Sequence, residues 1–441
     1  MRKQLAAVAG ALLITAVLQG CGGDDDSGGG AGQTINVLIG ANTIYPDQQR
    51  QWFTEVSDRF AKENGGATVK FETFASPNDE LTKIQTSVLS NQGPDVYALG
   101  TTFTPTAAAT GAFETLGADQ WAKIGGRDRF VPATLGISGP DPEHEVGIPF
   151  AQRPFVMAYN KDMLAAAGID KPADSWDGLL QQAKKMTGDG KFGMAISYAD
   201  GFDPWKFIWA MSIQAGNPLV DGSTASLNDP RTLLAYQTYL SWLATDKVVD
   251  PAAVGWKSAQ SIAAFGQGKA AYLPMVSASS RVTLDKSSVA GKYAYALMPV
   301  IPPGATSTPA GGKPAASILS GDNLVVAKYS KHKDLAFALV KMLTEADSQQ
   351  SYYKTFGEMP TNTQAAEALK SDPLVAPIIE SAQKSVGTPF TGAWSQIQLA
   401  LLNVVVQTIP DLSAGKVDQA KLKGLVDQAQ TTAQGALDKA K

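Results

Sequence analysis

The chain has 441 residues, 44% of them hydrophobic and 18% charged, so it has the composition of a globular protein that is too long for one ordinary core. Its 37 basic and 41 acidic residues give a net charge of −4, and no basic stripe stands out, which argues against a nucleic-acid partner. With Cys21 as the single cysteine, the chain forms no internal disulfide. We therefore expect a protein of two lobes.

Residues 1–20 have the pattern of a signal peptide. The apolar run Leu5–Leu18 follows two basic residues and is too short for a stable membrane span. It ends in Leu18-Gln19-Gly20-Cys21, which resembles the lipobox of bacterial lipoproteins, although Gln19 departs from the small residue usual there. The resemblance implies that Cys21 is acylated and anchors the chain to the membrane. The alternative is a conventionally secreted protein with one spare thiol.

Residues 21–33 are predicted to be the lipidated cysteine and a flexible tether. The segment Gly22–Gln33 has no apolar side chain larger than alanine, so it has nothing to pack into a core. A dozen such residues have a root-mean-square reach of roughly 20 Å. The expected result is a folded body held close to, but off, a membrane surface.

The next hundred residues alternate between strand and helix patterns. Strands are predicted before, between and after two amphipathic helices, which is typical of a parallel α/β sheet. Ligands of such sheets gather at the loops that follow the strands, here Ala41–Tyr45 and Gly100–Phe103. The predicted strands are Thr34–Gly40, Val69–Thr73 and Asp95–Leu99, and the helices begin near Asp47 and Ser76.

The stretch from residue 147 to residue 162 changes this pattern. Pro149 and Pro154 restrict the backbone and remove donors, so we predict a stiff extended connector rather than a helix or a central strand. Phe155–Tyr159 is then a short buried strand, and Asn160 is the N-cap of a following helix. Such a connector suits a crossing between two lobes, and on these residues alone an ordinary loop before a strand is an equal alternative.

A second set of α/β elements follows the connector and supports a second lobe. The pattern predicts strands at Gly193–Tyr198, Ala270–Met275 and Tyr293–Pro303, and helices at Pro172–Met186, Leu233–Leu243, Lys333–Leu343, Trp394–Ile409 and from Val417 onward.

Several separated segments of the chain form a recognisable series. They are Gly93-Pro94-Asp95-Val96, Ile148-Pro149 with Tyr159-Asn160-Lys161-Asp162, Ala167-Gly168-Ile169 with Ser175-Trp176-Asp177, Phe265-Gly266-Gln267-Gly268-Lys269-Ala270-Ala271, Ser320-Gly321, and Met359-Pro360-Thr361-Asn362. Together they resemble the extracellular solute-binding protein family of ABC importers, in the sugar-binding branch that includes maltose-binding protein. They occur in the family's order and, with the lipobox-like segment, span nearly the whole chain.

The resemblance implies an α/β, two-lobed, periplasmic-binding-protein-like (type II) fold with a multi-segment hinge and an interlobe ligand cleft. The expected crossings are Gly147–Arg153, Leu297–Pro303 and a segment near Gly357–Asn362. The first lobe would comprise residues 34–147 and a return segment, 299–356, and the second lobe residues 148–298 and a helical C-terminal part, 357–441.

The resemblance also implies the function. The chain would be a monomer without a cofactor, anchored on the extracytoplasmic face of the bacterial cell membrane through Cys21. It would capture a carbohydrate in the cleft and deliver it to the transmembrane subunits of an ABC permease. It would not be an enzyme.

Sugar sites combine aromatic rings with polar groups that bind hydroxyls. Trp205 and Trp394 match stacking positions of the family, and the alternative for Trp205 is simple packing at a helix start. Arg153 could equally be a hinge residue paired with a carboxylate. The predicted ligand-binding residues are the aromatic Tyr45, Phe103, Trp205, Trp256 and Trp394 and the polar Arg153, Asp203, Asp322 and Glu358.

Other functions have weaker support in the sequence. His144 and His332 lie in polar surroundings, and the chain has no Cys/His metal spacing, Walker loop, GxGxxG or Gly-x-Ser-x-Gly motif. A glycosidase with two paired carboxylates remains a rival from a different class. A closer rival is the same fold binding glycerol phosphate, a polyamine or a compatible solute.

Overall fold

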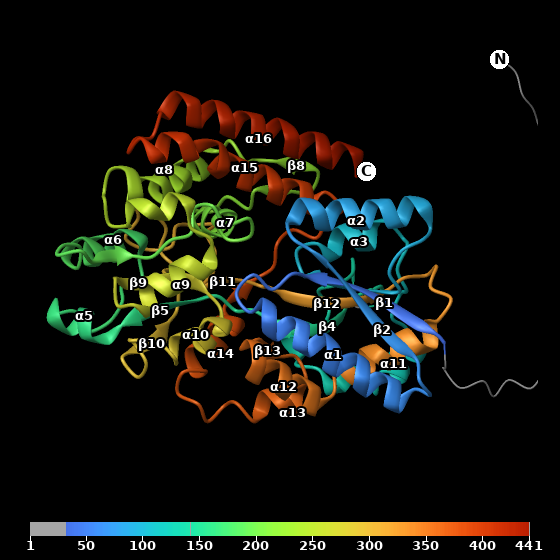
Figure 1. Cartoon of the computed structure of the whole chain (residues 1–441). Coiled ribbons are helices and arrows are strands. Elements are labelled where there is room, and N and C mark those ends of the chain that lie inside the picture. The colour runs from blue at the N-terminus through green and yellow to red at the C-terminus, as the bar shows by residue number, and fades with distance from the viewer. Residues whose placement is uncertain (1–31, 142, 441) are drawn as a thin grey trace, which may run out of the picture.

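The computed structural model describes residues 32–141 and 143–440. Within them the chain builds two main β-sheets, which lie on the right and the left of Figure 1. The predicted signal peptide, the Cys21 lipidation site and nearly all of the predicted tether lie outside the described residues. No helix within the described part is long and apolar enough to cross a membrane.

The larger sheet has six strands in the order β13-β4-β12-β3-β1-β2. The first three strands of the chain run parallel to one another, as predicted, whereas β12 is antiparallel to both β3 and β4. Its strands are β1 (Thr34–Gly40), β2 (Thr68–Phe74), β3 (Val96–Gly100), β4 (Ile148–Gln152), β12 (Gly321–Val326) and β13 (Met359–Pro360).

The helices of this first lobe follow from local signals. In α1 (Pro46–Glu63) the residues Trp52, Val56 and Phe60, spaced by four, form the buried face. In α2 (Pro77–Ser90) the Ser76 side chain accepts a hydrogen bond from the first turn and Pro77 occupies the first helical position. The other helices of this lobe are α3 (Thr104–Ala109), α4 (Ala118–Lys123), α11 (Lys333–Leu343), α12 (Ala346–Phe356) and α13 (Thr363–Glu367).

The smaller sheet has four strands in the order β10-β5-β9-β6. The predicted strand after Pro154 is confirmed as β5, and the Asn160 side chain caps the next helix by accepting from the amides of Asp162 and Met163. The strands are β5 (Val156–Asn160), β6 (Phe192–Met194), β9 (Ala270–Val276) and β10 (Tyr293–Ala296), and the short pairs are β7 (Val220–Asp221) with β8 (Thr224–Ala225) and β11 (Ser317–Ile318) with β14 (Ser385–Val386).

Helices cover the second lobe, and four of them contribute many buried residues to its larger core cluster, namely α7 (Pro204–Gln214), α8 (Pro230–Ala244), α15 (Trp394–Ser413) and α16 (Gln419–Lys439). In Figure 1 the helices α15 and α16 lie along the top, in contact with each other, and α15 also contacts α2 and α3 of the first lobe. The remaining helices are α5 (Lys161–Ala166), α6 (Trp176–Lys185), α9 (Ser258–Gly266), α10 (Arg281–Leu284) and α14 (Ala376–Gln383).

The prediction that the prolines exclude a central strand is wrong for Pro149. This residue lies within β4, between β12 and the two-residue strand β13. The register of β4 against β12 shifts between Asp322 and Asn323, and Asn323 is the partner of Pro149. A local irregularity of this kind tolerates a residue that lacks a backbone donor. The crossing itself is short, because β4 ends at Gln152 in one sheet and β5 begins at Val156 in the other.

Two other crossings lie later in the chain than the sequence predicted. Beyond β10, the amides of Val300 and Ile301 donate to the carbonyl of Asp174, so Leu297–Pro303 packs within the second lobe. The chain enters the larger sheet only at Gly321. Likewise β13 pairs with β4 of the larger sheet, whereas α14 contacts β5 and β10 of the smaller sheet, so the third passage falls between β13 and α14.

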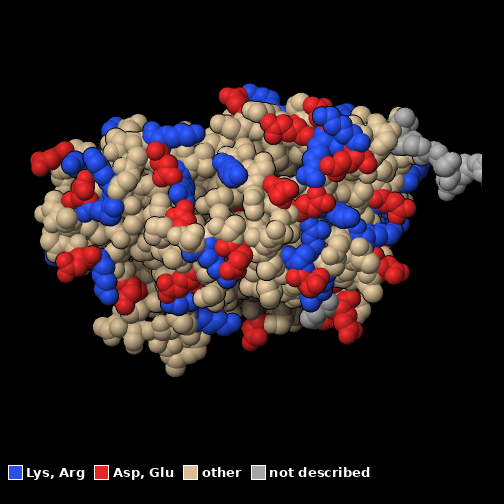
Figure 2. Space-filling view, turned by 90° about the horizontal axis from the view of Figure 1, so that it is seen from below, with Lys and Arg blue, Asp and Glu red and all other residues tan. Residues whose placement is uncertain are grey.

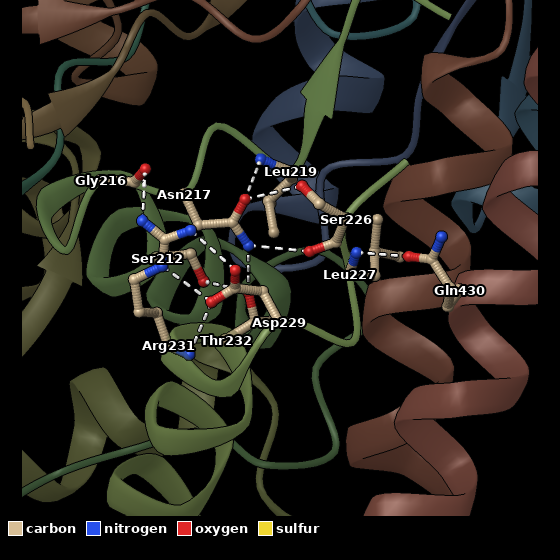
Figure 3. A network of polar contacts seen from close by, with 10 residues as sticks. All are labelled: Ser212, Gly216, Asn217, Leu219, Ser226, Leu227, Asp229, Arg231, Thr232 and Gln430. Carbon is tan, nitrogen blue, oxygen red and sulfur yellow. Dashed lines mark hydrogen bonds and ion pairs between the residues drawn. The ribbon is translucent and has the colours of Figure 1, made fainter. Parts of the chain in front are cut away.

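A buried polar network links the elements of the second lobe (Figure 3). Nδ2 of Asn217, which is 1% exposed, donates to the carbonyl of Ser226 and to Oγ1 of Thr232, both at 2.8 Å. Oε1 of Gln430 in α16 accepts from the amide of Leu227 at 2.6 Å. Because these polar groups are hydrogen-bonded to one another, we infer that the network stabilises the second lobe.

Candidate ligand-binding cleft

A cavity of about 280 Å³ lies between the two sheets. Its first-lobe wall comes from the loops after β1 and β3, where strand ends were expected to place a ligand. Its second-lobe wall comes from residues 202–206, at the start of α7, and from the end of β9 with the serines that follow it. Seven of the nine predicted ligand residues line this cavity: Tyr45, Phe103, Arg153, Asp203, Trp205, Asp322 and Glu358.

The loop after β1 is held in shape by two amide side chains. Asn42 Oδ1 accepts from the amide of Tyr45 at 2.8 Å, and the amide of Asn42 donates to Gln49 Oε1 at 2.8 Å. This geometry directs Tyr45 across the cleft, where its hydroxyl donates to the carbonyl of Ser279 at 2.7 Å and lies 3.1 Å from Oγ1 of Thr283. Burial raises the pKa of Tyr45 above its usual value. The phenol therefore stays neutral and links the two lobes.

Arg153 lies between two carboxylates at the end of β4. Its guanidinium makes two hydrogen bonds to Asp322, one of them at 2.9 Å, and Nε lies 2.9 Å from Oε2 of Glu358. Burial alone would lower the pKa of Arg153, but the two acids outweigh it and hold that pKa well above its usual value. Burial raises the pKa of Glu358, and Arg153 opposes this shift. The sequence analysis offered two roles for Arg153, a ligand contact or a hinge residue paired with a carboxylate. The structure shows Arg153 paired with carboxylates, and Arg153 also lines the cavity.

Glu80 is a wall residue that the sequence analysis missed. It projects from the first turns of α2, and only 2% of its surface is exposed. The nearby backbone of Gly100 acts to lower the pKa of its carboxyl, while its Oε1 has no hydrogen-bond partner among the described residues. Burial, and then the charge of Asp322, hold the pKa of Glu80 well above its usual value. Its position one helical turn before Ile84, on the buried face of α2, was the signal that could have found it.

A second charged cluster lies on the wall contributed by α7. Nζ of Lys206 is 2.8 Å from Oδ1 of Asp203 and 4.2 Å from the centre of the Phe155 ring. Oγ of Ser258 lies 2.5 Å from Oδ2 of Asp203 and 2.8 Å from Oδ2 of Asp200. Burial, and then the charge of Asp203, raise the pKa of Asp200. The sequence identified Asp203 but not the lysine that neutralises it.

The three predicted tryptophans differ in their positions. Trp205 is 1% exposed and lines the cavity, and its ring meets that of Trp394 edge-on at 6.2 Å between centres. Trp394 is fully buried behind it and does not reach the cavity wall. Trp256 packs against the core of the second lobe and is also absent from the wall. The residue of α15 that does line the cavity is Gln398, one turn beyond Trp394, and its Oε1 has no partner among the described residues.

Other wall residues were also missed by the sequence analysis. They are Phe155, Phe202 and Tyr352, which add aromatic surface, and the hydroxyl-bearing Ser277, Ser279 and Ser280 that follow β9. The wall thus combines rings, which pack against apolar faces, with donors and acceptors suited to hydroxyl groups. Within residues 32–141 and 143–440, no group of three or more histidine, cysteine, aspartate or glutamate side chains could hold a metal ion.

The family of the chain follows from a comparison with known protein families. The family model described as bacterial extracellular solute-binding protein matches residues 46–350, which is more than half of the chain. The chain belongs to this family. A relative from Streptomyces coelicolor, the diacetylchitobiose binding protein DasA, is 26% identical over 410 residues, which cover 90% of this chain and 91% of that protein.

Solved structures of solute-binding proteins share the two-lobed fold. Maltose-bound MalE3 from T. maritima superposes with a TM-score of 0.74 at 19% identity, covering 90% of this chain and 99% of that one. A solute-binding protein from Agrobacterium radiobacter in complex with ribitol gives a TM-score of 0.73 at 19% identity, over 92% of this chain and 100% of that one. At these identities the likeness establishes the fold alone, and it confirms the expected two-lobed α/β architecture.

Proposed function

We propose that this solute-binding protein captures a sugar or oligosaccharide in the interlobe cleft and delivers it to the permease of an ABC importer. The observation that carries the proposal is the composition of the cavity wall. Rings from both lobes, among them Tyr45, Phe103 and Trp205, surround a space that is also lined by carboxylates and hydroxyls. This combination suits the apolar faces and the hydroxyl groups of a sugar.

Closure of the two lobes around the sugar is the proposed switch. In this structure the lobes already touch. The Tyr45 hydroxyl donates to the carbonyl of Ser279, and a methyl group added at the Cα of Gly201 would lie 3.8 Å from Cδ of Pro77. A ligand that contacts both walls stabilises the closed form and shifts the population toward it. The closed form would then dock on the transmembrane subunits, with the protein acting as a monomer that binds its ligand without converting it.

The extracytoplasmic location is part of the same proposal. The lipobox-like segment at Cys21 would anchor the protein to the outer face of the cell membrane through a lipid. Acidic and basic side chains are interspersed over the face seen in Figure 2. This face therefore shows no basic patch of the kind that binds anionic lipids, which fits a body held near the membrane by its N-terminal tether.

The test is a thermal-shift screen of the soluble part, residues 32–441, against mono- and oligosaccharides, followed by intrinsic tryptophan fluorescence. A bound sugar stabilises the folded protein, by about 2.7 kcal/mol when the sugar concentration is a hundred times Kd. The melting temperature therefore rises. Turnover of any sugar during incubation would show an enzyme instead of a binding protein. A broad panel that changes neither the melting temperature nor the fluorescence would contradict the sugar proposal.

A further inference from the structure

The charges on the cavity wall do not balance. Lys206 pairs with Asp203, and Arg153 is shared between Asp322 and Glu358. Two cations therefore face three paired carboxylates, and one further carboxylate on the wall has no ion-pair partner among the described residues. The wall residues concerned are the acidic Glu80, Asp203, Asp322 and Glu358 and the basic Arg153 and Lys206.

The unpaired carboxylate is Glu80, and its geometry leaves one oxygen available. The nearby backbone of Gly100 favours the ionised form and so acts to lower the pKa of this carboxyl, while Oε1 has no hydrogen-bond partner among the described residues. Only 2% of the Glu80 surface is exposed, and the side chain lines the cavity. A buried polar atom without a partner is costly, which makes Oε1 an acceptor that a ligand donor would satisfy.

A second unpartnered acceptor comes from the opposite lobe. Gln398 of α15 is 3% exposed and lines the same cavity, and its Oε1 also has no partner within the described residues. The rings of Tyr45, Phe103 and Trp205 lie on the same wall. Such rings contact the apolar faces of a sugar and also attract a positive charge.

We propose that the preferred ligand of this cleft is an amino sugar whose ammonium group binds the Glu80 carboxylate. An ammonium group has three donors and no acceptor, so it can donate to an acceptor without a partner such as Oε1 of Glu80. It also supplies a positive charge to a wall on which acids outnumber bases, whereas a neutral hydroxyl does not. The inference rests on the proposed function, because it names the class of sugar that the same cavity takes.

Binding of an ammonium group would release a proton. In the empty cleft, burial and Asp322 favour the protonated form of Glu80, and Arg153 opposes them. These two groups come from β12 and from the end of β4, while α7 contributes the Lys206–Asp203 pair to the same wall. Glu80 must ionise to pair with the ammonium, so its proton passes to solvent. The affinity for the amino sugar therefore rises with pH until the amine itself loses its proton.

The experiment is isothermal titration calorimetry on residues 32–441 with chitobiose, which carries two free amino groups, and with the neutral N,N′-diacetylchitobiose and cellobiose. We expect chitobiose to bind at least about ten-fold tighter than either neutral disaccharide. Measured in two buffers of different ionisation enthalpy, its binding releases protons, and its affinity is higher at about pH 7 than at about pH 5.5. The neutral disaccharides show neither effect.

Two variants make the test specific to Glu80. Glu80→Gln keeps the size of the side chain but removes its charge, so chitobiose loses its proton release and its advantage over the neutral disaccharides when all three are measured on the same variant. The matched control is Glu55→Gln on the exposed face of α1, which changes nothing. An unchanged preference for chitobiose in Glu80→Gln would overturn the inference.

The outcomes separate this inference from the proposed function. If neutral disaccharides bind as tightly as chitobiose or tighter, the amino-sugar inference fails and the sugar-binding function stands. If no sugar binds but spermidine does, the ligand is a linear polyamine, and both the sugar function and the inference built on it fail.

Discussion

Arg153→Met tests the charged cluster beneath the cleft. The substitution removes the cation from between Asp322 and Glu358 while keeping a side chain of similar length. Removing one partner of a buried ion pair typically costs about 3–5 kcal/mol, because the other charge stays buried and unpaired. The Arg153 side chain keeps 27% of its surface exposed, so we expect the lower end, about 3 kcal/mol. That is a large part of the roughly 5–15 kcal/mol by which proteins are stable.

The loss of stability in Arg153→Met should increase with pH. Burial already raises the pKa of Glu358, and removal of Arg153 would raise it further. A carboxyl whose folded-state pKa lies above its unfolded value favours folding at low pH and loses that contribution as pH rises through the folded pKa. The destabilisation is therefore larger at about pH 7.5 than at about pH 5.

The assay is denaturant unfolding of residues 32–441 at both pH values. Arg50→Met is the control, since Arg50 forms an exposed pair with Asp47 and its loss should cost about 0–1 kcal/mol. Glu358→Gln in the Arg153→Met background should recover part of the loss. A loss of stability below about 1 kcal/mol that does not change with pH would refute the reasoning.

Three further substitutions address binding, closure and anchoring. Trp205→Phe should weaken sugar binding by about 1–3 kcal/mol in calorimetry, since it reduces the ring surface on the wall; unchanged affinity would show that this ring is not used. Gly201→Phe should lower the affinity by keeping the lobes apart at Pro77, and equal or tighter binding would argue against closure. Cys21→Ala should release the full-length protein from membranes on fractionation, and continued retention would refute the lipid anchor.

Periodic patterns predicted most of the elements because they depend only on neighbouring residues. The alternation at Thr34–Gly40 and the helical face of Trp52, Val56 and Phe60 are local signals, and both elements are confirmed. The strand that contains Pro149 was not predicted. A proline is accommodated there because the pairing of β4 with β12 is irregular, and β12 lies far away in the chain. The crossings after β10 and after α12 were misplaced for the same reason, since sheet membership is a property of the partner strand.

The site was predictable where a residue lies in a loop that follows a strand. Tyr45, Phe103 and Asp203 were found in this way and line the cavity. Glu80 and Gln398 lie inside amphipathic helices, where the pattern identifies a buried face but not what that face touches. Trp394 was chosen by resemblance to the family and Trp256 for its place shortly before the Phe265–Lys269 stretch. Neither signal resolves whether a ring reaches the cavity or packs one layer behind it.

Hydrogen exchange with and without the sugar selected by the thermal-shift screen tests the central claim most directly. The account predicts that the ligand slows exchange in segments from both lobes at once, namely Ala41–Tyr45, Gly100–Phe103 and residues 200–206. Protection confined to one lobe, or lying outside these three segments, would contradict binding between the lobes.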